Sequence, residues 1–404
     1  MPAPTAFDGG SFDAALDRTT NSHVAYGNKA TMLFDGANSF PERNKLIDGA
    51  KSSINLQTFI FNSDDTGWEL ANRLAAKAKE GVKVRVIYDA MGSNRADPKM
   101  FEMMKKAGVD LHAYAPPKDQ PWNINSRWHE KHLIIDGKTS IEGGMNIANE
   151  YALGGSGKMV FSRGKTATEP WRDADVKLEG PGVHDTQAAF LKNWETVTGT
   201  KLGPDERAKL LPPITPSIDG AQVRVVQHRP DQEGDSNVKH LYLQAINTAQ
   251  KSITIENAYF LPPKELHDAL ISAARRGVDV KVMTNSRASN DTGVVSDAAR
   301  YFYDDLIKAG VKIYEKQGGT LHAKTATFDG AYSIVGSANM NGRSDGRDSE
   351  DVLAIKDPAT AGQLEGRFAS GLSQTKQVTA AELKHEGFFK NLEQWACSTL
   401  AWTF

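Results

Sequence analysis

Apolar and polar positions along the chain switch repeatedly between the period of a strand and the period of a helix. In the first half the pattern predicts, in order, a strand at 54–61, a helix at 67–79, a strand at 82–88, a helix at 99–107 and a strand at 109–114. The helix at 67–79 is a clear case of an amphipathic pattern, with apolar Trp68, Leu70, Ala71, Leu74 and Ala75. Strands that alternate with helices in this way indicate an α/β sheet covered by helices.

The second half of the chain repeats the first. The matching pairs are "AKSSINLQTFIF" at 50–61 with "AQKSITIENAYF" at 249–260, "GVKVRVIYD" at 81–89 with "GVDVKVMTN" at 277–285, and "KKAGVDLHAY" at 105–114 with "IKAGVKIYEK" at 307–316. The second half is accordingly predicted to carry strands at 253–260, 278–284 and 311–315 and helices at 263–276 and 293–309. A separation of about 200 residues is too long for a solenoid repeat and indicates two copies of one domain.

These repeats divide the chain into four parts. We assign 1–28 to an N-terminal extension, 29–200 to the first α/β domain, 201–220 to a linker and 221–404 to the second α/β domain with a C-terminal helical extension. The linker assignment depends on four prolines and the lack of a clear period. Aromatic residues near the end, such as Trp395 and Trp402, are expected to dock the terminal helix on the core, with a membrane-interface belt as the alternative.

The composition is typical of a globular protein and argues against one class of partner, nucleic acid. Of the 404 residues 39% are hydrophobic and 24% charged, and the formal net charge of −2 argues against a bulk electrostatic grip on nucleic acid. The single cysteine, Cys397, cannot form an intramolecular disulfide. No apolar run is long enough to span a bilayer, and the opening residues lack a signal-peptide pattern. The expected location is the cytoplasm or a membrane surface, with signal-independent export as an alternative.

One short motif occurs once in each copy. Its members are His129, Lys131 and Asp136 in the first copy and His322, Lys324 and Asp329 in the second, at the spacing H-x-K-x4-D. Each motif is followed by a glycine-rich step and an asparagine, namely Gly143, Gly144 and Asn146, then Gly336, Ser337 and Asn339. In both copies the asparagine lies 17 residues after the histidine. A single H-x-K is common by chance, whereas two with matching downstream offsets indicate a shared centre.

The residue types in this motif suit an anionic phosphodiester. Side chains two apart on a strand face the same way, so each histidine and its lysine project together. Asp136 and Asp329 have the opposite parity and are expected to be structural. The lysines and asparagines would donate to the oxygens of a phosphoryl group, and Gly144 and Ser337 would add close contacts to it.

Histidine can act here in either of two roles. A neutral ring can attack phosphorus, whereas a protonated ring can give its proton to the leaving alcohol and then activate the incoming water or alcohol. With an ordinary histidine pKa of about 6.5, both forms are accessible near neutral pH. The residue types alone do not decide which histidine does which.

The paired motifs with a downstream G-G/S-x-N resemble those of the phospholipase D superfamily. The resemblance runs from about Ala30 to about Thr375, and "ENAYFLP" at 256–262, "TNSRASND" at 284–291 and "WRDADVKLEGPGV" at 171–183 are most similar to its bacterial cardiolipin synthase and phospholipase D branch. It implies two homologous α/β domains, each a mixed sheet flanked by helices, packed as a pseudo-twofold pair around one site. It also implies a covalent phosphohistidine formed without a metal or other cofactor, with His129 as nucleophile and His322 as general acid and base.

The resemblance further implies an acidic partner for each histidine. Glu350 lies 28 residues after His322 in the family's position for this partner, and Asp173 occupies the matching context 44 residues after His129. The longer spacing in the first copy points to an insertion, for which residues 151–170 are the candidate. We expect this loop to border the site and to contact lipid.

His132 forms an H-x-x-H pattern with His129, a pattern that can belong to a zinc site. On a strand the two rings would face opposite ways, and no cysteine pair supports them. We therefore expect His132 to pack or to support its neighbours, and we expect no metal ligands in the motif.

The function expected from these residues is that of a phospholipase D-type phosphodiesterase or phosphatidyltransferase. Acting on glycerophospholipids through a phosphohistidine, it would hydrolyse the head group or transfer the phosphatidyl group to an alcohol. Cardiolipin synthesis as the main activity and a metal-independent nuclease are the alternatives, and a silent lipid-binding scaffold is disfavoured because both motifs are complete. The expected partner is a phospholipid at a membrane surface, reached by peripheral contact, and not a nucleic acid.

Overall fold

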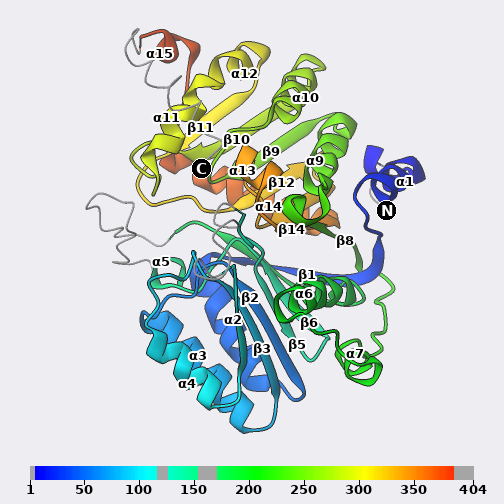
Figure 1. Cartoon of the computed structure of the whole chain (residues 1–404). Helices are drawn as coiled ribbons and strands as arrows, with labels where there is room; N and C mark the ends of the chain where they lie inside the picture. Colours follow the sequence, from blue (N-terminus) through cyan, green and yellow to red (C-terminus); the bar gives the residue numbers. More distant parts are fainter. Residues whose placement is uncertain (1–4, 116–125, 153–170, 386–404) are drawn as a thin grey trace.

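The computed structural model describes residues 5–115, 126–152 and 171–385 as two α/β units that share one sheet (Figure 1). Residues 153–170, which are all but the first two residues of the predicted loop, and residues 386–404 of the predicted C-terminal extension lie outside the described residues. Among the residues that are described, no helix is long and apolar enough to cross a membrane.

The first half of the chain follows the predicted alternation of strands and helices. Its strands are β1 (Ala25–Phe34), β2 (Ser53–Thr58), β3 (Lys83–Asp89), β4 (Asp110–Tyr114), β5 (His132–Ile135), β6 (Thr139–Gly143) and β7 (Ala174–Glu179). Its helices are α1 (Gly10–Thr19), α2 (Asp35–Gly49), α3 (Asp65–Lys79), α4 (Pro98–Lys106), α5 (Asn149–Ala152), α6 (Val183–Thr198) and α7 (Pro204–Leu210). The last of these lies in the segment that we assigned to a linker.

The second half repeats these elements. Its strands are β8 (Ala221–His228), β9 (Ser252–Asn257), β10 (Asp279–Asn285), β11 (Lys312–Lys316), β12 (Lys324–Phe328), β13 (Tyr332–Gly336), β14 (Glu350–Lys356) and β15 (Thr375–Gln377). Its helices are α8 (Pro230–Glu233), α9 (Asn237–Thr248), α10 (Lys264–Arg275), α11 (Gly293–Tyr301), α12 (Tyr303–Ala309), α13 (Gly342–Gly346), α14 (Pro358–Gly371) and α15 (Ala380–His385). The prediction of a single helix at 293–309 is wrong, because the segment forms two helices, α11 and α12, that are separated at Phe302.

Both halves have the same strand order. Read toward the centre, it is β4-β3-β2-β5-β6-β7-β1 in the first half and β11-β10-β9-β12-β13-β14-β8 in the second, with β15 added outside β11. Strands β2, β3 and β4 pair in parallel, as do β9, β10 and β11, whereas the strands nearer the centre pair antiparallel. Strands β1 and β8 then pair antiparallel with each other, so the described strands form one continuous mixed sheet. The predicted fold class, two such units in a pseudo-twofold arrangement, is confirmed.

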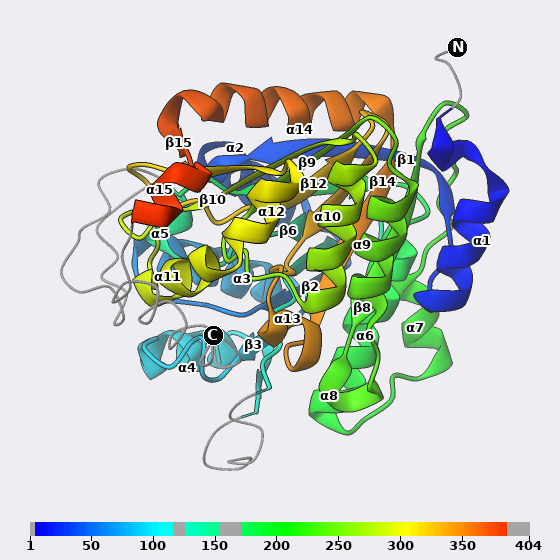
Figure 2. The same ribbon diagram turned by 90° about the horizontal axis from the view of Figure 1, so that it is seen from above.

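Helices cover both faces of the sheet, as strands buried on both faces require. Helices α2, α3 and α4 contact one another or strands of the first half, and α9, α10 and α12 do so in the second (Figure 2). The long helices α6 and α14 each also touch the first strand of the other half, β8 and β1 respectively. Strand β2 shows the consequence, because its polar residues are buried as well as its apolar ones, and Asn55 donates to Gln187 of α6 at 2.9 Å.

Apolar packing holds the halves together in two places. A shared core combines buried residues of both halves, among them Trp128, Ile134, Val225 and Leu353. Residues 5–19 cross over to the second half, where Phe7 stacks on Tyr332 with ring centroids 5.2 Å apart. The segment that we assigned to an N-terminal extension is therefore part of the core of the second half.

Candidate active site

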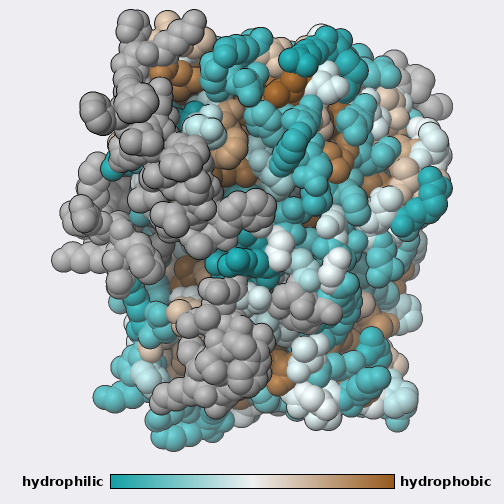
Figure 3. All heavy atoms as spheres, turned by 45° about the horizontal axis from the view of Figure 1, so that its top comes forward, coloured by the Kyte–Doolittle hydropathy of each residue, from teal (hydrophilic) through white to brown (hydrophobic). Residues whose placement is uncertain are grey.

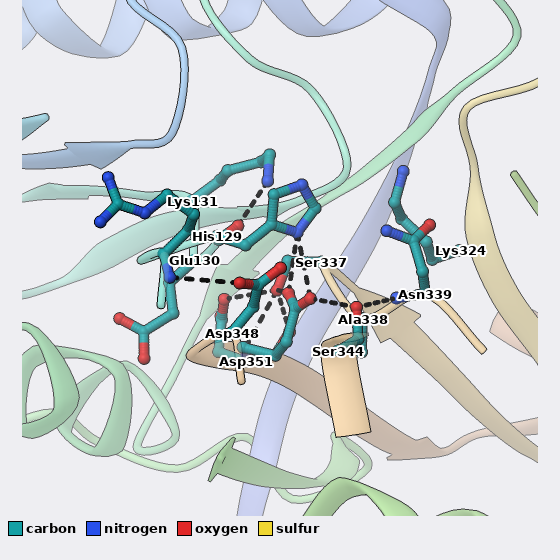
Figure 4. Close-up of polar contacts among 12 residues, drawn as sticks. His129, Glu130, Lys131, Lys324, Ser337, Ala338, Asn339, Ser344, Asp348 and Asp351 are labelled. Carbon is teal, nitrogen blue, oxygen red and sulfur yellow. Dashed lines mark hydrogen bonds and ion pairs between the residues drawn. The ribbon is translucent and has the colours of Figure 1, made fainter. Parts of the chain in front are cut away.

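The two H-x-K segments lie at the boundary between the halves, immediately before or at the start of a strand. His129 and Lys131 precede β5, and Lys324 is the first residue of β12. Both lysines are almost fully buried, and each donates a hydrogen bond from Nζ to the carbonyl oxygen of its own histidine. Figure 4 shows His129 between Lys131 and Lys324 in this view, with Asp351 below it. The structure thus brings the two motifs together.

His129 is held by a carboxylate from the other half of the chain. Its Nδ1 lies 2.9 Å from Oε2 and 3.1 Å from Oε1 of Glu350, which is the first residue of β14. Glu350 is itself fixed by two hydroxyl groups, because Ser337 donates to Oε2 at 2.5 Å and Ser344 donates to Oε1 at 2.6 Å. This arrangement orients the ring and leaves Nε2 as the nitrogen available for chemistry.

His322 is held in the reciprocal way by a carboxylate from the first half. Its Nδ1 lies 2.7 Å from Oδ2 of Asp173, just before β7. The other oxygen of Asp173 accepts the amide of Ala174 at 2.8 Å. Lys324 Nζ also lies 3.0 Å from Nδ1 and 3.1 Å from Nε2 of His322, so the lysine and the ring share one small volume.

Backbone pairing explains why each histidine meets the carboxylate of the other half. The amide of His129 donates to the carbonyl of Ser349 at 2.9 Å, one residue before Glu350. The amide of His322 donates to the carbonyl of Arg172 at 2.7 Å, one residue before Asp173. The sequence spacing predicted that each histidine pairs with the carboxylate of its own copy, and this prediction is wrong. The two backbone contacts place Glu350 beside His129 and Asp173 beside His322.

Burial of the lysines weakens their hold on a proton. Loss of water lowers the pKa of Lys131 to about 8, against the attraction of the Glu350 carboxylate. In the same way burial lowers the pKa of Lys324 to about 7, although the Asp173 carboxylate opposes the change. Both lysines thus titrate near neutral pH, where an added anion would favour their charged form.

Burial also shapes the two His–carboxylate pairs. Loss of water and then the charge of the nearer lysine keep the pKa of both His129 and His322 well below the ordinary value. Burial raises the pKa of Glu350 to about 7 and the pKa of Asp173 to about 6. Both rings are therefore mainly neutral until an anion joins the lysines.

The four residues expected to contact phosphate divide into two groups. Asn146 and Asn339 lie beside the site. Asn146 donates to the Tyr151 hydroxyl at 2.8 Å, and the buried Oδ1 of Asn339 has no hydrogen-bond partner among the described residues. Gly144 and Ser337 instead serve the carboxylates. The amide of Gly144 donates to Ala174, and a Cβ at Gly144 would come within 2.2 Å of Asp173. The Ser337 hydroxyl is engaged by Glu350, so neither residue presents a free donor to a phosphate.

Asp136 and Asp329 lie in tight turns that follow β5 and β12. Both have a φ of 54°, in the left-handed region that aspartate tolerates better than most residues. The Asp136 carboxylate accepts the amides of Lys51, Ser52 and Ser53, the last two at 2.7 and 2.9 Å. Asp329 repeats the arrangement on residues 250–252. These contacts point away from the histidines and fit the structural role that we predict for both residues.

Replacing Asp136 with alanine is expected to lower the free energy of unfolding by about 2–3 kcal/mol, because three amides lose their acceptor and alanine resists a positive φ. Asp136→Asn is expected to lose less, about 1 kcal/mol, since asparagine keeps one acceptor oxygen and tolerates this φ. Urea unfolding followed by circular dichroism measures both changes. Folded Asp136→Ala protein that had lost turnover out of proportion to its stability would place Asp136 in the reaction instead.

Several residues around the histidines escaped the sequence argument. Phe59 packs edge-on against His129 with centroids 5.1 Å apart, and Tyr151 and Trp171 pack against His322 at 5.1 and 5.3 Å. Ser344, which holds Glu350, was also missed. Each lies within a few residues of a motif that we had singled out, but nothing in the type or spacing of these residues marks them as partners of a histidine.

One further group of buried residues could hold a metal ion. His132, Glu142 and Asp351 bring one possible ligand atom each to within 4.8 Å of one another. His129 is not a member of this group. The four residues of the two His–carboxylate pairs contain no such triad among the described residues.

The chain is similar in sequence to bacterial cardiolipin synthases. The family described as "Cardiolipin synthase, PLD-like domain" matches residues 44–167 and 242–372. A cardiolipin synthase of Halalkalibacterium halodurans is 31% identical over 387 residues, which cover 95% of this chain and 74% of that protein. The major cardiolipin synthase ClsA of Bacillus subtilis is 32% identical over 369 residues, with coverage of 90% and 73%. The crystal structure of a phosphatidylserine synthase from Haemophilus influenzae shares the fold, with a TM-score of 0.73, 15% identity, and coverage of 98% of this chain and 100% of that one.

Proposed function

The chain belongs to the cardiolipin synthase family of phospholipase D-like proteins, and from that premise we propose that it transfers a phosphatidyl group to an alcohol through a covalent phosphohistidine. The observation that carries the proposal is the pair of crossed contacts, His129 with Glu350 and His322 with Asp173, each beside a buried lysine. One centre thus offers two rings oriented through Nδ1 and two cations, which are the groups that a two-step displacement at phosphorus needs.

In the first step, His129 is the proposed nucleophile. Its Nε2 attacks phosphorus, the bond to the leaving head-group alcohol breaks, and a phosphatidyl group remains on the ring. Glu350 holds Nδ1–H of His129, which fixes the tautomer and stabilises the positive charge that the ring gains. The two serine hydroxyls on Glu350 keep that carboxylate in place throughout.

His322 is the proposed proton donor and acceptor. It gives a proton to the leaving oxygen in the first step and takes one from the incoming hydroxyl in the second, so protons balance over the cycle. Before substrate binds, burial and Lys324 disfavour its charged form and keep its pKa low. A bound phosphodiester brings a negative charge that offsets the lysines, so substrate itself would raise the pKa of His322 and load it with the proton that it must deliver.

Lys131 and Lys324 are the proposed donors to the phosphoryl oxygens, with Asn146 and Asn339 as neighbouring amides. Negative charge on those oxygens increases in the transition state, and a buried ammonium stabilises it more than an exposed one does. The side chains of His129 and His322 are only 12% and 6% exposed. Such limited access of water favours an alcohol that is bound in place over water as the acceptor.

The pH dependence of kcat/KM provides one test of the lysines. A lysine is charged below its pKa and neutral above it, so with a pKa of about 8 for Lys131 and about 7 for Lys324 the attraction for a phosphodiester is lost as pH rises through 7 to 8. We expect kcat/KM to fall on this alkaline side. In Lys324→Arg the guanidinium stays charged, so the fall is expected to move from about pH 7 to about pH 8, where Lys131 still loses its proton, even though the rate itself is lower. An alkaline limb that did not move in the variant would contradict the assignment of Lys324.

We propose that the acceptor is the glycerol head group of a second phospholipid, because the similar proteins are named cardiolipin synthases. Vesicles containing phosphatidylglycerol provide donor and acceptor together, and the protein would reach them by peripheral contact. Mass spectrometry of the lipid products is the test. Cardiolipin with released glycerol is the expected result, phosphatidic acid alone would indicate a hydrolase, and phosphatidylethanol after addition of ethanol would report the shared intermediate in either case.

Nuclease activity is the alternative that this experiment must also address. The described surface seen in Figure 3 is mostly hydrophilic, with apolar residues in separate patches, and the chain carries a net charge of −2. A nuclease needs a strongly basic surface track to hold a polyanion. Incubation of single-stranded and double-stranded DNA with the same preparation, at low salt, is therefore expected to leave the DNA intact, and rapid DNA cleavage with no lipid product would overturn the proposed function.

A further inference from the structure

We propose that His132, Glu142 and Asp351, called here the His132 cluster, form a binding site for a divalent transition-metal ion such as Zn²⁺. The three residues come from the starts or ends of three strands, β5, β6 and β14, and therefore from both halves of the chain. Each side chain is about 1% exposed. The site is separate from the phosphodiester chemistry and is proposed to hold the halves together.

The distances within the cluster suit an ion better than hydrogen bonds. Nδ1 of His132 lies 3.4 Å from Oδ2 of Asp351 and 3.9 Å from Oε2 of Glu142. These separations are too long for good hydrogen bonds, and all three atoms are buried with no hydrogen-bond partner in the part of the chain that the structure describes. Ligands bound tetrahedrally to zinc at about 2.0–2.2 Å lie about 3.3–3.6 Å from one another. A small inward movement would complete that geometry.

The remaining atoms of the cluster are already fixed in place. The other carboxylate oxygen of Glu142 accepts the hydroxyls of Ser140 at 2.8 Å and Thr186 at 2.5 Å. This leaves Oε2 as the oxygen that faces His132, and no described residue donates a hydrogen bond to it. A carboxylate with one oxygen anchored and the other unpaired is oriented as a ligand would be.

The second ring nitrogen of His132 faces a carboxylate, as is usual for a histidine bound to a metal. Its Nε2 lies 3.8 Å from Oε2 of Glu130, whose side chain points away from His129 in Figure 4. Glu130 is held by Gln57 at 2.6 Å and by Gln227 at 3.0 Å. The same small movement that completes the ligand geometry would bring Nε2–H within hydrogen-bond distance of Glu130 and direct Nδ1 toward the ion.

Charge in this buried region also favours a cation. Glu130, Glu142 and Asp351 are three carboxylates around one imidazole, and an unbalanced negative charge is costly at full burial. A divalent ion would neutralise this negative charge, and a proton shared within the cluster is the competing arrangement.

The two copies of the repeat differ at this cluster. The structural counterparts of His132 and Glu142 in the second copy are Thr325 and Val335, at the same offset that relates His129 to His322. Strand register pairs Gly143 with Asp175 and Gly336 with Val352, which makes Ala174 the counterpart of Asp351. The cluster therefore has three ionisable residues where the equivalent positions around the other motif have Thr325, Val335 and Ala174. Neither the shared fold nor the duplicated chemistry requires the cluster.

The donor set indicates which ions would bind. One imidazole nitrogen and two carboxylate oxygens suit Zn²⁺ and neighbouring first-row ions, whereas Mg²⁺ and Ca²⁺ prefer oxygen ligands alone. Three protein ligands also leave a position for water or for a second oxygen of a carboxylate. An ion bound there would fix Asp351 and, through the backbone, the adjacent Glu350 that orients His129.

The test is metal binding by the untagged, full-length protein, freed of metal with a chelator and dialysed. Wild type is expected to take up one Zn²⁺ per chain, counted by inductively coupled plasma mass spectrometry, and to melt at a higher temperature when loaded. The variant His132→Thr, Glu142→Val, Asp351→Ala carries the residues of the second copy at all three positions. It is expected to bind Zn²⁺ at least about 100-fold more weakly and to show no thermal shift.

Two controls keep the result decisive. His112→Gln removes a partly exposed histidine that lies 2.9 Å from Asp110, outside the cluster, and it is expected to leave uptake unchanged. If the triple variant does not fold, a zinc absorption-edge spectrum of loaded wild type replaces it, with one imidazole, oxygen ligands and no sulfur expected. Wild type that takes up less than a stoichiometric amount of Zn²⁺, Mn²⁺, Co²⁺ or Ni²⁺, uptake that survives in the folded triple variant, or a spectrum with several imidazoles would each overturn the proposal.

Discussion

The His129→Ala protein is expected to fold and to turn over phospholipid at least about 10⁴-fold more slowly than wild type, because alanine removes the atom that attacks phosphorus. Glu350 would be left buried beside its two serines, so a loss of stability is expected as well. Initial rates on mixed vesicles measure the first effect and thermal melting the second. Near-normal turnover by this variant would rule out His129 as nucleophile.

A substrate with a good leaving group separates the roles of the two histidines. An aryl phosphodiester that releases p-nitrophenolate needs little help from a general acid, so His322→Ala should still form the intermediate and then stall. The phosphorylated residue can be identified by mass spectrometry of peptides under conditions that preserve phosphohistidine. We expect the group on His129, with His112→Gln as a control that behaves as wild type. Label on His322 in a His129 variant would reverse the assignment.

Glu350→Gln is expected to reduce kcat by about 10²–10⁴-fold, because a neutral amide holds the wrong tautomer of His129 and cannot stabilise its positive charge. The crossed pairing makes a sharper forecast. With the aryl substrate, Glu350→Gln should slow formation of the intermediate, as His129→Ala does, whereas Asp173→Asn should leave that step nearly intact and slow its breakdown, as His322→Ala does. Pre-steady-state measurement of the p-nitrophenolate burst distinguishes the two.

The opposite pattern would contradict the crossed pairing in solution. If Asp173→Asn abolished the burst and Glu350→Gln preserved it, then either the carboxylates would serve the histidines of their own halves or the roles of the two histidines would be exchanged. The phosphopeptide experiment decides between these two explanations, because it identifies the nucleophile without reference to the carboxylates.

The elements of this fold were predictable because they depend on short-range pattern. Strand and helix positions in both halves followed from periodicity, and the duplication followed from matched segments in the same order at separations close to 200 residues. The break at Phe302 did not, because Tyr303 and Leu306 continue the apolar pattern of Val295, Ala298 and Ala299, which a single helix could also have satisfied. A periodic pattern specifies which face is buried but not whether the axis of the helix bends.

The pairing of carboxylates was beyond the reach of sequence spacing for a different reason. It depends on two isolated bridges, Trp128 with Ser349 and Arg172 with Leu321, which join segments far apart in the chain. No local signal marks such a bridge. The roles of Gly144 and Ser337 escaped in the same way, since whether a glycine amide or a serine hydroxyl is free depends on which carboxylate lies opposite it.

The crossed pairing and the position of residues 5–19 together have a consequence for synthesis of the protein on the ribosome. The first half can emerge with His129 and Lys131 in place, but Glu350 has not yet been made, and Phe7 and Phe12 have no Tyr332 to pack against. Contacts between residues so distant in sequence form late in folding. A nascent or truncated chain would therefore carry an unassembled centre, and lipid chemistry would begin only after both halves had closed on each other.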